Sequence, residues 1–171
     1  MAKLNEGYGY GQVELNQVAF RRDGRIIAQY ALDGMDYAEN GMLLAVDYVN
    51  RKIKKPTKAD DNTVVALNYT TEHMYDERLA GGLRHFKLDK DTFRPRLGLL
   101  TTGDRFTTNT VVYTTDTLQA LETAINGGTA YGHVSTDGYI TVNTTATSAL
   151  LKAIEYTTMP DGAPAIKFVV L

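Results

Sequence analysis

Cysteine and tryptophan are both absent from this chain of 171 residues. Without cysteine the protein can form no disulfide, no thiolate metal site and no thiol nucleophile. The absence also fits a protein that is made and assembled in a reducing cytoplasm. Without tryptophan the chain lacks the large aromatic ring best suited to stacking on a sugar, so a carbohydrate-binding module is only a minor alternative.

Long apolar runs and a strong net charge are absent as well. The longest unbroken aliphatic run covers residues 42–46, far short of the roughly 20 residues that a membrane helix needs. The first residues contain no apolar core and no small-residue cleavage site, so we expect no secretion signal. The formal net charge of −2 argues against a dedicated nucleic-acid binder, which usually has a strongly basic face. We therefore expect neither nucleic acid nor membrane as a partner.

What is present is an ordinary globular composition, with 43% hydrophobic and 22% charged residues. A chain of this length buries roughly 70% of its unfolded surface, enough for one domain or two small ones. Residues 1–100 contain 15 basic and 14 acidic residues, whereas residues 101–171 contain only 3 and 6, so the chain changes character near residues 93–109. From this change we predict three parts: an extended N-terminal arm at 1–11, a charged β-rich domain at 12–92 and a threonine-rich, β-barrel-like domain at 93–171.

The spacing of apolar residues predicts short strands in the N-terminal half. Alternation over residues 12–20 predicts a strand, with a bulge near residues 16–17 where the alternation slips by one position. Asp23-Gly24 is a strong hairpin signal and leads into a second strand at 26–32. Further strands are predicted at 42–49 and 64–69.

A small barrel or sandwich with one helix is predicted for the C-terminal half. Residues 105–113 are rich in β-branched and aromatic residues and should form one strand. The helix should run from Asp116, its N-cap, to Asn126, with Gly127 as a left-handed C-terminal cap. The remaining strands are predicted at 131–134, 139–142, 149–157 and 165–171, the last two joined by a proline-first turn at 159–162.

Paired threonines recur in this half of the sequence. Their branched carbon favours a strand and their hydroxyl can face water, so we expect them on the outer face of the sheet. A sugar-binding face is the less favoured alternative, because the chain has no tryptophan to stack on a sugar ring. The pairs are Thr107-Thr108, Thr114-Thr115, Thr144-Thr145 and Thr157-Thr158.

One cluster of residues suggests chemistry. His73 with Asp76 or Glu77 would share one face of a helix and could bind a metal or act as acid and base. No second histidine lies at ligand spacing and no serine lies in a nucleophile elbow, so salt bridging at the surface is the favoured interpretation. His85 and His133 stand alone and are interpreted as ordinary surface or half-buried side chains. We therefore predict no catalytic residues, no cofactor and no metal site.

Two surface segments have a composition that favours contacts. The basic run at 51–56 is interpreted as a solvated strand edge, with polyanion binding as a less favoured alternative. The segment 7–11 alternates glycine with Tyr8 and Tyr10, which gives a flexible backbone that carries two amphipathic rings. A frayed terminus and a docking arm are both consistent with this pattern. If the segment is an arm, Tyr8 and Tyr10 are the expected contacts with a partner.

Five stretches carry a resemblance and follow one another along most of the chain. They are AENGMLLAVD at 38–47, YDER at 75–78, RLG at 96–98, GDRFTTN at 103–109 and MPDGAPAIKF at 159–168. In these stretches the chain resembles small virion structural proteins of tailed bacteriophages, many of which infect Gram-positive bacteria. Such proteins are often encoded near the major capsid protein. The resemblance implies no catalytic residues.

A structural role in the virion follows from this resemblance. It implies a capsid decoration or cement protein that binds the outside of the major capsid lattice and stabilises the head. The implied partners are the major capsid protein and further copies of the chain, with a trimer favoured. The implied location is the capsid surface, and the host cytoplasm during assembly. A tail or head-completion protein is the alternative, and a carbohydrate-binding module is a weaker one.

Overall fold

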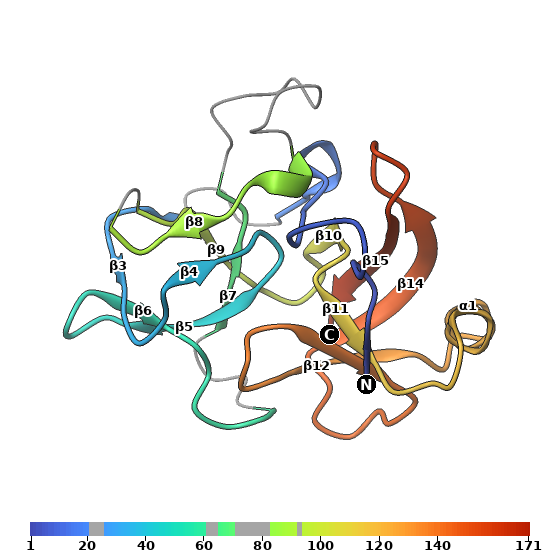
Figure 1. Cartoon of the computed structure of the whole chain (residues 1–171). Coiled ribbons are helices and arrows are strands. Elements are labelled where there is room, and N and C mark those ends of the chain that lie inside the picture. The colour runs from blue at the N-terminus through green and yellow to red at the C-terminus, as the bar shows by residue number, and fades with distance from the viewer. Residues whose placement is uncertain (21–25, 61–64, 71–82, 92–93) are drawn as a thin grey trace.

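The computed structural model describes residues 1–20, 26–60, 65–70, 83–91 and 94–171, and within them the protein is mainly β with one α-helix (Figure 1). The described strands form three sheets, of seven, six and two strands. None of these three sheets closes into a barrel, because the end strands of each larger sheet do not pair with each other. The mainly β class is therefore confirmed, and the predicted barrel is wrong.

The seven-stranded sheet has the strand order β1-β11-β13-β12-β14-β15-β10. Neighbouring strands are antiparallel except for β11 and β13, which run parallel. A parallel pair needs a crossover connection, and here α1 and β12 lie between the two strands along the chain. The strands are β1 (Ala2–Lys3), β10 (Arg105–Thr108), β11 (Val111–Tyr113), β12 (Tyr131–Val134), β13 (Ile140–Asn143), β14 (Leu151–Thr158) and β15 (Pro164–Val170).

The six-stranded sheet has the order β2-β9-β7-β5-β6-β3. Strands β3 and β6 run parallel, and the other neighbours are antiparallel. The third sheet is an antiparallel pair of β4 and β8. The strands of these two sheets are β2 (Ile26–Ile27), β3 (Ala31–Leu32), β4 (Tyr37–Ala38), β5 (Leu43–Asp47), β6 (Lys52–Lys54), β7 (Val65–Asn68), β8 (Leu88–Asp89) and β9 (Leu97–Leu99).

The central strands of the six-stranded sheet are buried on both faces. Leu43 of β5 belongs to a core cluster with Phe106 and Phe168 of the seven-stranded sheet. The next residue, Leu44, belongs to a second cluster that includes Leu88 of β8. Because successive side chains of a strand point to opposite faces, the six-stranded sheet is a middle layer with a core on each side.

The N-terminal segment is part of this fold. Strand β1 pairs with β11, where Ala2 lies opposite Tyr113. Leu4 is 3% exposed and belongs to the larger core cluster. The backbone N–H of Leu4 donates to the carbonyl of Val111 at 2.8 Å. The arm expected to project from the domain is therefore wrong for residues 1–4, which close one edge of the seven-stranded sheet.

The sheets also cross the expected domain boundaries. Strand β9 lies beyond residue 92, yet it pairs with β2 and β7 of the six-stranded sheet. Strand β1 lies before residue 12, yet it pairs with β11 of the other sheet. The division between sheets therefore does not coincide with residues 11/12 and 92/93, and the two halves of the chain share one core.

Three predicted strands are interrupted. The strand expected at 26–32 is divided into β2 and β3, which are the two end strands of the six-stranded sheet. In place of a bulge near residues 16–17, a 3-10 turn, η1 (Leu15–Gln17), separates two isolated bridges that reach β10. The predicted strand 105–113 is divided into β10 and β11 by a tight turn, in which the N–H of Val111 donates to the carbonyl of Asn109 at 2.8 Å. This turn lets the chain leave one edge of the seven-stranded sheet and rejoin it near the other.

Thr107 and Thr108 are buried beside this turn, which corrects the expectation that they face water, and Thr110 within the turn is buried as well. The Thr107 hydroxyl donates to the side-chain oxygen of Gln17 at 2.7 Å. The Thr108 hydroxyl donates to the carbonyl of Gln12 at 2.6 Å, and the Thr110 hydroxyl donates to the carbonyl of Asn40. Thr107 and Thr108 thus tie the N-terminal segment to β10, and Thr110 ties the turn to Asn40. The Thr108 and Thr110 hydroxyls satisfy buried carbonyl groups.

Helix α1 (Leu118–Asn126) lies where it was expected, with small differences at both ends. Its N-cap is Thr117 and not Asp116, because the Thr117 hydroxyl accepts from the N–H of Ala120 at 3.1 Å. At its C-terminus Gly127 is right-handed, and Gly128 has the left-handed conformation, with φ of 66°. Leu121 and Ile125 are buried in the larger core cluster, as their helical spacing indicates.

Several predicted elements match closely. Strand β12 covers the predicted residues 131–134, and β13, β14 and β15 begin and end within two residues of their predicted limits. The turn at 159–162 is present, with the N–H of Gly162 donating to the carbonyl of Met159 at 2.9 Å. The Asp23-Gly24 turn lies outside the described residues. In the part of the chain that the structure describes, no helix is long and apolar enough to cross a membrane.

Candidate functional site

Tyr10 and Tyr37 form an aromatic pair at the surface. Their rings meet edge to face, with centroids 5.8 Å apart. The ammonium of Lys87 lies 5.9 Å from the Tyr10 centroid and 5.2 Å from the Tyr37 centroid, within the range of a cation–π contact. An ion pair with Asp89 at 2.8 Å holds Lys87 and raises its pKa. We call Tyr10, Tyr37 and Lys87 the aromatic ridge.

Three separate segments position the aromatic ridge. Tyr37 lies on β4, opposite Asp89 of β8. The N–H of Tyr10 donates to the carbonyl of Arg84 at 2.9 Å, in the 3-10 turn η2 (Leu83–His85). A Cβ atom at Gly9 would lie 2.1 Å from that same carbonyl oxygen, and Gly9 has φ of 92°, so only glycine fits there. The glycines that suggested flexibility in the sequence therefore bring Tyr10 close to η2.

A hollow adjoins the aromatic ridge, and Tyr37 lines it. Its volume is about 360 Å³, which is at the lower end of the range for small-molecule sites. Charged residues of both signs line the hollow. The basic ones are Lys3 and Lys55, and the acidic ones are Asp36, Glu39 and Asp137. Tyr139 also lines the hollow, and the Lys3 ammonium lies 4.2 Å from the centroid of its ring.

Glu39 and Tyr139 form a buried pair beside this hollow. Glu39 is only 4% exposed, and its carboxylate accepts from the Tyr139 hydroxyl at 2.7 Å and from the N–H of Gly11. Burial raises the pKa of Tyr139, and the neighbouring carboxylate raises it further, so the phenol keeps its proton. A phenol in this state can donate a hydrogen bond but cannot act as a base. The pair therefore ties Gly11 of the N-terminal segment to Tyr139, the residue that precedes β13.

The structure describes only two of the residues for which the sequence suggested chemistry, His85 and His133. His73, Asp76 and Glu77 lie outside the described residues. His85 is exposed in η2. His133 is more buried than expected, with one ring nitrogen 3.0 Å from an Asp60 carboxylate oxygen and the other 2.9 Å from the Thr145 carbonyl. Among the described residues, no group of three or more histidine, aspartate or glutamate side chains could hold a metal ion.

The two tyrosines expected to contact a partner lie in different settings. Tyr8 is partly exposed, and Tyr10 is half-buried in the aromatic ridge. Sequence reasoning missed Tyr37, Glu39 and Tyr139, which complete the site. Their partners are far away along the chain, up to 100 residues for Tyr139 and Glu39, so no local pattern could indicate them.

Comparisons with known proteins give no relative. No protein-family model matches the chain, and neither a curated protein nor a solved structure matches it.

Proposed function

We propose that the protein is a non-enzymatic structural component of a tailed-bacteriophage virion, a capsid decoration or cement protein. In this role it binds the outside of the major capsid lattice as a homo-oligomer, with a trimer favoured, and stabilises the head. The proposal starts from the stretches that resemble virion proteins, of which 38–47, 96–98, 103–109 and 159–168 lie in described parts of the fold. Its location is the capsid surface, after assembly in the host cytoplasm.

The observation that carries the proposal is the aromatic ridge. Tyrosine is enriched at protein interfaces because it supplies a large contact area with few rotatable bonds. Here Tyr10 and Tyr37 are already held by each other, by Lys87 and by the backbone of η2. A surface that is ordered before binding loses little conformational entropy on binding. This is the property that a protein needs if it is to attach to a lattice through a small set of contacts.

Stoichiometry in purified particles tests the proposal. We expect quantitative mass spectrometry to find the protein at high copy number, comparable with the number of capsid lattice positions. A copy number of only a few per particle would favour the tail or head-completion alternative. Absence from the particle would contradict a role in the virion altogether.

Attachment to heads that lack the protein tests the aromatic ridge itself. Replacing Tyr10 and Tyr37 together by alanine should weaken binding by about 2–4 kcal/mol, the loss typical of two interface anchors. Tyr131→Ala is the matched control, because it removes a half-buried tyrosine from β12 of the seven-stranded sheet. Equal binding by the double variant and the wild type would show that the ridge is not the contact surface.

A further inference from the structure

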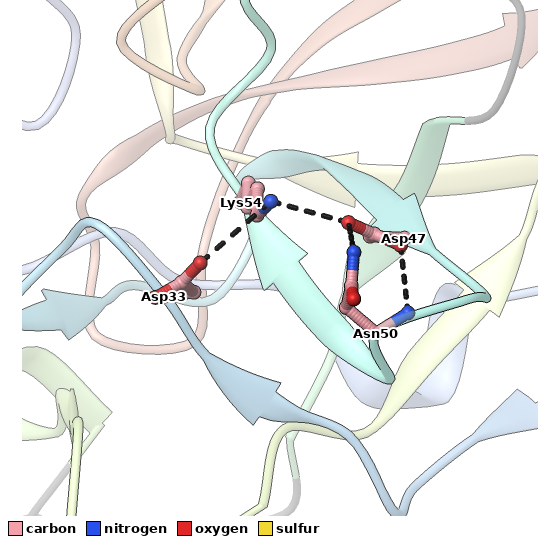
Figure 2. Close-up of polar contacts among 4 residues, drawn as sticks. All are labelled: Asp33, Asp47, Asn50 and Lys54. Atoms are coloured by element: carbon pink, nitrogen blue, oxygen red, sulfur yellow. Dashed lines mark hydrogen bonds and ion pairs between the residues drawn. The ribbon is translucent and has the colours of Figure 1, made fainter.

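Polar contacts among Asp33, Asp47, Asn50 and Lys54 hold the turn between β5 and β6 (Figure 2). One carboxylate oxygen of Asp47 accepts from the backbone N–H of Asn50 at 3.0 Å. The other accepts from the Asn50 side chain at 2.9 Å and from the Lys54 ammonium at 3.1 Å. Asp33 lies 3.7 Å from the same ammonium. Four side chains from three segments therefore fix the shape of this turn.

The electrostatics agree with this geometry. Hydrogen bonds from Asn50 and then from Lys54 hold the pKa of Asp47 far below its usual range. The contact with Asp47 in turn raises the pKa of Lys54. Inside the turn, Arg51 has φ of 54°, a left-handed conformation that is unfavourable for a residue with a Cβ atom. Strained residues of this kind persist where the surroundings hold them, and they concentrate at functional positions.

The fixed turn presents apolar side chains to solvent. Val49 is 91% exposed and Tyr48 is 49% exposed. The Tyr48 ring meets Tyr30 edge to face, with centroids 6.3 Å apart, so its position is also fixed. In Figure 1 the loop between β5 and β6 projects from the side of the molecule opposite α1. A β-branched apolar residue held rigidly at the tip of a projection is suited to insertion into a partner.

Basic residues follow this tip along the chain. Residues 47–58 contain five basic residues and one acidic residue, a net charge of +4 on a chain whose total is −2. Lys54 is paired with Asp47 and Asp33, but Arg51, Lys52 and Lys58 make no ion pair with any residue that the structure describes. We call residues 47–58 the basic hairpin.

We propose that the basic hairpin docks on an acidic protein surface, with Val49 and Tyr48 entering an apolar socket whose rim carries carboxylates. An apolar centre with a charged rim is the usual anatomy of a protein–protein contact. A nucleic acid would match the charge, but phosphate binding gives no use for an exposed valine at the centre. The inference rests on the proposed function, because it places the acidic surface on the head lattice. It adds a second contact, separate from the aromatic ridge.

The test measures binding to heads that lack the protein. These heads are titrated with purified variants at several salt concentrations. Val49→Asp should bind at least tenfold more weakly than wild type, because it places a carboxylate among carboxylates. Leu171→Asp is the matched control, since it adds the same charge at an exposed apolar residue of the C-terminus and should bind as wild type does. Both variants should melt close to the wild type, because Val49 is 91% exposed and Leu171 is 50% exposed.

Charge reversal separates the electrostatic contribution. Arg51→Glu with Lys58→Glu should weaken binding at low salt and make the affinity less dependent on salt, because charges near a surface are screened. If Val49→Asp binds heads as wild type does, the inference is overturned while the proposed function stands. Two other outcomes with head binding intact also overturn the inference. If Val49→Asp abolishes self-association, the partner is a second copy of the chain. If it abolishes binding to duplex DNA, the partner is a nucleic acid. If the wild type does not bind heads, the proposed function fails and the inference fails with it.

Discussion

Leu4→Ala tests whether the N-terminal segment belongs to the core. Leu4 is buried in the larger cluster, so the substitution removes apolar contacts and leaves a cavity. Such changes cost about 2–5 kcal/mol. Because β1 is a two-residue edge strand, the site can partly collapse, and we expect a loss of about 2–3 kcal/mol. For a chain of this size, that corresponds to a fall in Tm of roughly 4–12 °C.

Urea unfolding followed by tyrosine fluorescence is a suitable assay, because the chain has eleven tyrosines and no tryptophan. The midpoint should shift while the slope stays constant, which shows a change in stability alone. Glu6→Ala is the control, because this exposed side chain should change stability by no more than about 0.5 kcal/mol. If Leu4→Ala is as stable as Glu6→Ala, β1 is not docked and the segment is the free arm that its glycines first suggested.

Two further predictions concern other parts of the fold. Gly98→Ala should destabilise the protein by about 1–3 kcal/mol in the same urea assay, because a Cβ atom there would lie 2.4 Å from the Phe20 ring. Unchanged stability would show that this ring does not pack on β9. Asp47 has a lowered pKa in the folded state, so its ionised form stabilises the protein above the unfolded pKa near 4, and this contribution is lost as the pH falls further. The difference in stability between wild type and Asp47→Asn should therefore shrink between pH 5 and pH 2, and a constant difference would contradict the hydrogen bonds drawn in Figure 2.

Local patterns in the sequence predicted much of the strand content. The Pro-Asp-Gly turn at 160–162 and the strands β12 to β15 have signals that need no distant partner. The spacing of Leu121 and Ile125 predicted the helix correctly. Its N-cap is one residue later than predicted, because the Thr117 hydroxyl and not the Asp116 side chain caps it. These elements depend on chemistry within a few residues, which sequence alone contains.

The missed features all depend on distant residues. Alternation along a strand cannot say which face is buried when both are, so Thr107 and Thr108 were expected in water and are in fact buried. The pairing of Ala2 with Tyr113 leaves no trace in either segment. The burial of Glu39 depends on Gly11 and Tyr139, and only the folded chain brings them together. The aromatic ridge and the hollow beside it were invisible in the sequence for the same reason.

The pairing of β1 with β11 also constrains how the chain can fold during synthesis. Residues 2–3 cannot reach their partners until residues 112–113 have been made. At ordinary synthesis rates of about 5–20 residues per second, the first strand waits roughly 5–20 s for its partner. During that interval Leu4 and the first tyrosines are exposed beside an incomplete sheet. The beginning of the chain can thus be fixed only after β11 has been made, and a premature stop before residue 111 would leave β1 without its partner strand.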